Sequence, residues 1–413
     1  LLFALYIDPY LYRLMNDDCI QPIVTSGYPT KILAYADDVA VVTSDPKQAL
    51  ESIEVAALEF GRLSGYSLNL TKTQVLVNRF CHCRTPFITD IVTYLGIRIT
   101  MDSGQLLQLN FDTLVKKTEV RLRSLNGLYL TPLGRCNFIK MEILPRFLYI
   151  FRSIPLYITK ARFKNLDSVC SSFIWSYRQP RRSLGKLTLP IERGGLGLPN
   201  IFLYYLATFL LHIRPLAMIQ DFSIVGIPSI YHLLLGSQAN GSLIKTFENN
   251  CFKGVRFKTI VAVKLIWKLM EKRLGLLKHT FYSSLWHNSC LGIMRDSQAA
   301  IWKKHGVLYV GDLYKGNVFV TFEQLKAKFS LPSQGFFKFL QIRDFVTKQN
   351  NLLCGEVPIM KKLCSKHRFR IGDFYKTLVE TEEDDIEFYN LKWAAKLEIS
   401  GTRSGRASCR ERV

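Results

Sequence analysis

Residues 31–44, KILAYADDVAVVTS, decide the fold at the start of this chain. Two adjacent aspartates, Asp37 and Asp38, separate two β-prone runs at 31–36 and 39–43. Asp is depleted in strands, and a buried unpaired carboxylate is costly. Two such runs around a two-residue centre predict a β-hairpin, with Asp37 ending the first strand and Asp38 in the turn.

The flanking sequence predicts helices and further short strands. An amphipathic helix is expected at 46–65, with Pro46 near its start and Gly65 at its end. A helix is expected at 1–17 with Leu2, Leu5, Tyr6, Leu11 and Leu14 on its apolar side. Strands are expected at 66–70, 73–77 and 93–100. This order predicts an α+β fold, an antiparallel sheet with packing helices.

The charge of the chain points to a polyanionic partner. The formal net charge is +22 over 413 residues. Residues 111–216 hold 17 Lys and Arg against 5 Asp and Glu, with aromatic residues between them. Such a balance is typical of proteins that bind nucleic acid or an acidic membrane surface.

A membrane-spanning protein is not expected. The longest apolar run, IFLYYLATFLLHI at 201–213, is shorter than the roughly 20 residues that a bilayer requires. The ten cysteines have no regular spacing, which favours a reducing compartment. We therefore expect an intracellular protein, in the cytoplasm and nucleus.

The acidic pair by itself leaves two interpretations open. Asp-Asp in a hairpin is commonly plain turn chemistry. Alternatively, two carboxylates at a hairpin tip supply the oxygen ligands that Mg²⁺ prefers, and a pair of such ions promotes phosphoryl transfer.

Several segments in one order resemble a known family. Tyr-Ala-Asp-Asp between hydrophobic strands resembles the active-site motif of reverse transcriptases. FGRLSGYSLNLTKTQVL at 60–76 is similar to the motif that follows it, and YLGIRIT at 94–100 to the hairpin that grips the primer. Segments 133–156, 173–208 and 322–345 resemble the second-reading-frame polyprotein of LINE-type non-LTR retrotransposons.

The resemblance implies roles for the residues that match these motifs. Asp37 and Asp38 would be catalytic carboxylates that bind two Mg²⁺ ions in the intact enzyme, and Lys72 would lie near the departing pyrophosphate. Tyr35 and Ala36 would lie near the primer end and the incoming dNTP. The primer grip would comprise Tyr94, Leu95 and Gly96, where glycine allows close backbone approach. Sheet packing for Tyr35, a core position for Leu95 and a solvated surface for Lys72 remain alternatives.

The basic region would hold an RNA template paired with a DNA primer. Cations that track a nucleic-acid backbone give salt-sensitive binding. Any single cation among them can instead be a solvated surface charge. The residues assigned to this role are Arg135, Lys140, Arg178, Arg181, Arg182 and Lys186.

The resemblance also implies a domain order. Residues 1–103 would be the C-terminal part of a reverse-transcriptase palm, and 104–190 a helical basic thumb. Residues 191–400 would form a mainly helical C-terminal region. The Gly/Ser/Arg-rich end at 401–413 resembles translated sequencing adaptor, or is a disordered tail.

These expectations define a fragment of an RNA-directed DNA polymerase. The family's site needs a further aspartate from an earlier strand, and Asp8 lies in a helix-like segment too close to Asp37 to supply it. We therefore expect the fragment alone not to polymerise DNA. The alternatives are a non-catalytic nucleic-acid-binding remnant or domesticated protein and, with little beyond charge behind it, a basic peripheral membrane protein.

Overall fold

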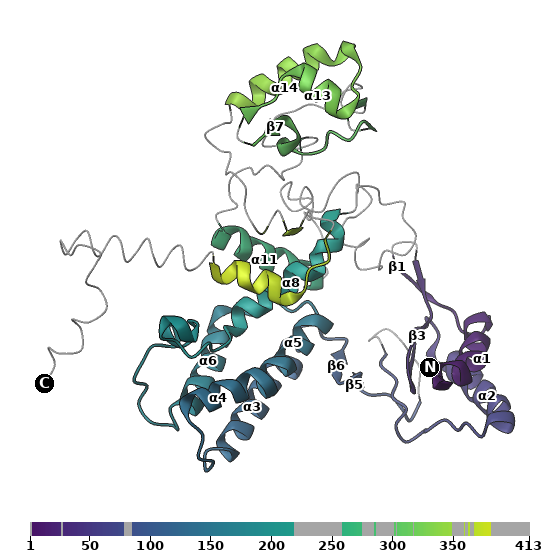
Figure 1. Ribbon diagram of the computed structural model, residues 1–413. Helices are drawn as coiled ribbons and strands as arrows, with labels where there is room; N and C mark the ends of the chain where they lie inside the picture. The colour runs from purple at the N-terminus through teal and green to yellow at the C-terminus, as the bar shows by residue number, and fades with distance from the viewer. Residues whose placement is uncertain are drawn as a thin grey trace, which may run out of the picture. The chain divides into compact units, whose positions relative to one another are not determined.

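The computed structural model describes residues 2–25, 28–77, 85–218, 258–274, 285, 301–302, 304–316, 318–348, 359, 362–363 and 367–380 (Figure 1). These residues are mainly helical, with small two-stranded antiparallel sheets, so the fold is α+β in a loose sense. The tail at 401–413 lies outside the described residues.

The described residues divide into two compact units. The first contains those up to Leu198 and the start of helix α11, and the second contains those from Pro199 onward apart from the start of α11. Residues 1–103 and 104–190, which the sequence assigns to palm and thumb, both belong to the first unit.

The first part of unit one is a pair of helices against a β-hairpin. Its helices are α1 (Leu2–Asn16) and α2 (Pro46–Ser64). Its strands are β1 (Ile23–Thr25), β2 (Tyr28–Thr30), β3 (Ile32–Tyr35), β4 (Asp38–Val41), β5 (Ile91–Tyr94) and β6 (Ile97–Thr100). They pair as three separate hairpins, β1–β2, β3–β4 and β5–β6, in place of the one sheet that the sequence predicts.

Helix α2 begins and ends where the sequence predicts. The Asp45 carboxylate accepts hydrogen bonds from the backbone N–H groups of Lys47 and Gln48, at 3.1 and 3.2 Å. Gly65 ends the helix with φ of 76°, a left-handed conformation that glycine adopts without strain.

The buried face of α1 differs from the prediction. The structure buries Ile7, Tyr10 and Leu14, whereas Leu2 is 84% exposed and Leu5 is 65% exposed. The expected stripe is confirmed at Leu14 and at Leu11, which packs half-buried against the same core. It is wrong at Leu2 and Leu5, because the buried side of the helix follows the spacing of Ile7, Tyr10 and Leu14.

The segment after α2 is not the pair of strands expected at 66–70 and 73–77. Asn69 organises a turn there, since its side-chain oxygen accepts hydrogen bonds from Thr71 Oγ1 and the Lys72 backbone N–H. Val75 forms a single parallel bridge with Ile88. The side chain of Asn69 competes with strand pairing, which is why the apolar alternation did not produce strands.

A helical bundle completes unit one (Figure 1). Its buried side chains include Phe111, Leu122, Phe147, Leu166 and Phe173. Helix α6 packs on both α3 and α4. The helices are α3 (Thr113–Ser124), α4 (Pro132–Phe138), α5 (Leu144–Ser153), α6 (Lys160–Ile174) and α7 (Leu184–Leu187), with π-helical turns at Gln108–Asp112 and Ile139–Ile143 and a 3₁₀ turn at Ile191–Arg193.

Unit two is helical around a second core. Trp302, Phe322 and Phe339 are among its buried side chains. Tyr204 and Tyr375 stack with ring centroids 3.9 Å apart. Its elements are α8 (Ile201–Met218), most of α11 (Lys258–Leu274), β7 (Tyr314–Lys315), β8 (Val318–Phe319), α13 (Phe322–Phe329) and α14 (Phe336–Lys348), with 3₁₀ turns at Val310–Leu313 and Ser333–Gly335.

Candidate functional site

The acidic pair lies at the tip of the β3–β4 hairpin, one position away from the predicted register. Tyr35 pairs with Asp38, so the two turn residues are Ala36 and Asp37. Asp38 therefore begins β4, and the expectation that Asp38 occupies the turn is wrong. Ala36 has φ of 52°, which costs a residue with a Cβ about 1–2 kcal/mol. A positive φ at the first turn position suits a two-residue hairpin.

The pairing decides which way the second carboxylate faces. Ile32, Val39 and Val41 pack against the core formed by α1 and α2. Because paired residues share a face and neighbouring residues alternate, Tyr35 and Asp38 lie on the opposite face of the hairpin. The Asp38 side chain is thus directed away from the apolar core.

Both carboxylates are exposed to solvent. The sequence suggested that both carboxylates lie against an apolar sheet, where desolvation would be costly. Because both are exposed, they do not carry this desolvation cost. Tyr35 is also 67% exposed, so it is not packed in a sheet core. The hairpin tip therefore presents Tyr35, Asp37 and Asp38 together, with Ala36 exposed between them.

Tyr94 connects the next hairpin to the acidic pair. Its hydroxyl donates a hydrogen bond to the Leu33 carbonyl of β3 at 3.4 Å. Burial and then the charge of Asp38 raise the pKa of Tyr94. Tyr94 is therefore close to Asp38, as expected if the two hairpins contribute to one site.

Tyr66 is a second tyrosine beside the pair, and sequence reasoning missed it. Its ring centroid lies 5.2 Å from that of Tyr10 and 5.7 Å from that of Phe60. Burial, then Tyr6 and Asp37, raise the pKa of Tyr66. The only sequence signal is its position directly after Gly65, where the chain turns back from the end of α2.

The turn at Leu95–Gly96 has both residues at positive φ, 47° and 76°, as in a type I′ hairpin. The strand expected over 93–100 is therefore a hairpin. A Cβ on Gly96 would meet only Tyr149 Cε1, at 3.9 Å, which is ordinary contact. Within the chain, glycine is therefore needed here for its φ. The Tyr149 hydroxyl donates to the carbonyl of the half-buried Leu95.

Lys72 lies in a surface turn. It is exposed in the turn after α2, where its backbone N–H donates to the Asn69 carbonyl at 3.1 Å. Among the described residues, its ammonium group makes no ion pair with Asp37 or Asp38.

The donor set at the tip fits a hard cation only in part. Two carboxylates are enough for Mg²⁺ when phosphates and water complete its shell. Within the described part of the chain, no three His, Cys, Asp or Glu side chains gather closely enough to hold a metal ion. Asp8 is exposed on α1. Asp37 and Asp38 are therefore the residues that would hold Mg²⁺, with the remaining ligands from elsewhere.

Arg135 differs most from its predicted role. It is 3% exposed, and its guanidinium donates to the carbonyls of Phe173 at 2.9 Å, Leu130 at 3.2 Å and Leu128 at 3.3 Å. Its Cζ also lies 4.8 Å from the Phe173 ring centroid. These contacts make Arg135 a structural residue in place of the nucleic-acid contact that the sequence predicted, because its donors are already used inside the bundle.

The other predicted cations are more accessible. Lys140 is half-buried beside the glycine turn, and its Nζ would lie 3.2 Å from a Cβ on Gly197. The remaining four are exposed in the segment after α6: Arg178, Arg181, Arg182 and Lys186.

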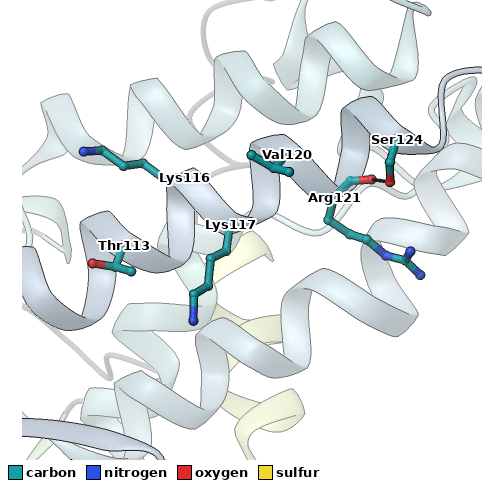
Figure 2. Close-up of a pocket in the computed structure, with 6 residues that line it drawn as sticks. All are labelled: Thr113, Lys116, Lys117, Val120, Arg121 and Ser124. Atoms are coloured by element: carbon teal, nitrogen blue, oxygen red, sulfur yellow. Dashed lines mark hydrogen bonds between the residues drawn. The ribbon is translucent and has the colours of Figure 1, made fainter.

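The structure adds a basic face on α3 that the sequence analysis did not single out (Figure 2). Lys116, Lys117 and Arg121 recur at helical spacing around the exposed Val120. Arg121 Nε lies 2.9 Å from Glu142 Oε1. An open depression of about 430 Å³ is lined by Thr113, Lys116, Lys117, Val120, Arg121 and Ser124. All six belong to one helix, so this is a helix face and not a cleft between elements.

A comparison with models of known protein families finds no match for the chain. Among the helices that the structure describes, none combines the length and the apolar character needed to cross a bilayer.

Proposed function

We propose that this chain is part of an RNA-directed DNA polymerase of the LINE-type non-LTR retrotransposon class. The observation that carries the proposal is the β3–β4 tip, which exposes Asp37 and Asp38 to solvent. Asp38 lies on the face away from the core, with Tyr94 of the next hairpin beside it. The Tyr-Ala-Asp-Asp resemblance predicts two carboxylates at a hairpin tip, and the exposed position of Asp37 and Asp38 supports the proposal.

The side chains have distinct tasks in this proposal. The two carboxylates supply oxygen ligands, and the Mg²⁺ ions that they hold would activate the primer hydroxyl and stabilise the leaving pyrophosphate. Tyr35, exposed on the same face as Asp38, is available to the primer end or the incoming dNTP. Tyr94 orients the primer-side hairpin through its hydrogen bond to Leu33.

The nucleic-acid partner is an RNA template paired with a DNA primer. The exposed cations after α6 and on α3 supply the positive surface that a phosphate backbone requires. Affinity for an RNA–DNA hybrid should therefore fall steeply as the salt concentration rises from 50 to about 200 mM. A flat salt response would contradict this part of the proposal.

The acidic pair can be tested without turnover. Fe²⁺ bound in place of Mg²⁺ generates hydroxyl radicals, which cut nucleic acid close to the ion. We expect the full chain with Fe²⁺, ascorbate and a primer–template hybrid to cut the strands near the primer 3′ end. Asp37→Asn with Asp38→Asn should abolish the local cut and keep hybrid binding. Asp18→Asn, another exposed carboxylate of the same unit, is the matched control and should cut normally.

Two outcomes would count against the proposal. Dispersed cutting that is unchanged in the Asp37→Asn, Asp38→Asn variant would show that the pair holds no ion near the primer. Primer extension by the full chain would contradict a narrower point, the expectation that this site needs a further carboxylate.

A second candidate function is nucleic-acid binding without catalysis, in a remnant or domesticated protein. The observation that favours it is the presence of only two carboxylates at the tip among the described residues. Salt-sensitive hybrid binding without any local cut by Fe²⁺ would select this candidate over the polymerase.

A further inference from the structure

The corner between α3 and α4, residues 125–131, carries one aromatic side chain that is fully exposed to solvent. Tyr129 is fully exposed, and the neighbouring Leu128 is 52% exposed. The Leu130 N–H donates to the Leu128 carbonyl at 2.8 Å, a bond between residues two apart that places Tyr129 at the apex of a γ-turn. The ring therefore projects from the tightest point of the corner.

This corner is fixed from inside the bundle. The buried Arg135 guanidinium donates to the carbonyls on either side of Tyr129, those of Leu128 and Leu130, and it also reaches the Phe173 carbonyl at the end of α6. The Asn126 N–H bonds the Arg123 carbonyl at 3.1 Å. A corner held by these bonds retains little backbone freedom, so less entropy is lost when Tyr129 binds a ligand.

The end of α6 brings a second aromatic residue to the same place. Ser176 and Tyr177 have φ of 54° and 58°, two consecutive non-glycine residues in the left-handed region. Such a conformation is strained for residues that carry a Cβ and persists only where the surrounding structure holds it. Arg123 Cζ lies 6.0 Å from the centroid of the Tyr177 ring. We call Arg123, Leu128, Tyr129 and Tyr177 the aromatic tip.

The surroundings of the aromatic tip are basic. The chain leaves Tyr177 directly into the exposed Arg178, Arg181 and Arg182. The acidic Glu119 is paired with Arg123 at 2.7 Å. Arg135 joins the corner that carries the exposed Tyr129 ring to the end of α6, which these arginines follow. An exposed ring and exposed guanidinium groups are together the combination that binds single-stranded nucleic acid, in which the base faces are accessible.

We propose that the aromatic tip binds a single-stranded segment of the nucleic acid, with Tyr129 stacked on an unpaired base and the arginines after Tyr177 on the phosphates. This inference rests on the proposed nucleic-acid function and adds the ligand form and the residue that contacts the base. Duplex regions would use the phosphate contacts alone, because their base faces are covered.

The experiment measures binding of the full chain to a 12-nucleotide RNA that carries 2-aminopurine, and to a 12-base-pair RNA–DNA hybrid. Stacking on a tyrosine changes 2-aminopurine fluorescence, and anisotropy gives the affinity. Tyr129→Ala should weaken single-strand binding about 5-fold or more, because base–aromatic stacking contributes about 1–3 kcal/mol. Hybrid affinity should change less than about twofold, since that contact is phosphate-based.

Two matched variants separate stacking from other effects. Tyr129→Phe keeps the ring and should retain both the affinity and the fluorescence change. Tyr12→Ala removes another strongly exposed tyrosine, on α1, and should bind like the unmodified chain. Both positions are exposed, so neither substitution disturbs the core.

Three results would overturn the inference. The first is that Tyr129→Ala binds the single strand as the unmodified chain does. The second is that it loses affinity equally for both ligands. The third is that it abolishes self-association of the chain, which would make a second copy the ligand. Each of these leaves hybrid binding by the unmodified chain in place. Absence of binding to either ligand by the unmodified chain would instead contradict the proposed function.

Discussion

The β3–β4 hairpin and the α3–α6 bundle use charged residues in opposite ways. In the hairpin, Asp37 and Asp38 are exposed at the tip, and Asp38 lies on the face away from the core. In the bundle, Arg135 is buried and its hydrogen bonds join the α3–α4 corner to the end of α6. A charge that contacts solvent is free to bind a ligand, whereas a charge whose hydrogen bonds are satisfied inside the protein stabilises the fold.

The largest change in the free energy of unfolding should come from a substitution in the α3–α6 bundle. Arg135→Ala removes donors from several carbonyls and leaves a cavity, so it should lower the free energy of unfolding by about 3 kcal/mol or more. Urea unfolding, with hydrogen exchange of the α3–α6 amides, measures the loss. The control Arg182→Ala removes an exposed guanidinium from the same unit and should change stability by less than about 0.5 kcal/mol. If the two variants were equally stable, Arg135 would not stabilise the fold through its buried hydrogen bonds.

A second prediction concerns a bundle carboxylate. Burial raises the pKa of Asp167 to about 6. Because the folded state then holds this proton more tightly than the unfolded state, stability should fall as pH rises from about 4 through 6. Asp167→Asn should gain about 1–2 kcal/mol at pH 7.5, allowing for solvent screening, and nothing at pH 4. Urea midpoints at the two pH values measure this. An equal gain at both would contradict the assignment.

A third and smaller effect concerns the helix that supports the hairpin. Asp45→Ala removes the side-chain cap from two N–H groups at the start of α2 and should cost about 1 kcal/mol. Asp45→Asn keeps the acceptor and should cost only a fraction of that. Hydrogen exchange of the first-turn amides of α2 measures both, and similar losses in the two variants would argue against capping.

The smallest effect on stability should come from the candidate site itself. Asp37→Asn and Asp38→Asn should each change the free energy of unfolding by less than about 0.5 kcal/mol, since both carboxylates are exposed and neither forms an ion pair among the described residues. The same urea experiment measures this change. A loss of more than 1 kcal/mol would mean that the pair supports the fold as Arg135 does.

Local sequence signals predicted local features well. The Asp45–Pro46 start and the Gly65 end of α2 follow from capping chemistry between near neighbours. The β3–β4 hairpin was predicted from two β-prone runs, although its turn is one residue earlier than expected. The observed pairing of Tyr35 with Asp38 places Ile32, Val39 and Val41 on the core side.

Nonlocal features were beyond sequence reasoning. Nothing in the sequence near Tyr66 indicates that it lies beside Asp37, because the fold brings α2 back to the hairpin. The aromatic residues of the bundle divide into buried Phe147 and Phe173 and exposed Tyr129. Their spacing predicts helices but does not indicate which face meets a neighbouring helix.

By itself, the sequence determined the basic character of the chain, the hairpin that carries Asp37 and Asp38, and the resemblance on which the proposed function rests. These depend on composition and on residues that are adjacent in the chain. Only the tertiary structure decided that Arg135 is buried, that Tyr94 reaches the acidic hairpin and that Tyr129 is displayed. Burial and proximity depend on how distant segments pack, and packing free energy belongs to all of those segments together.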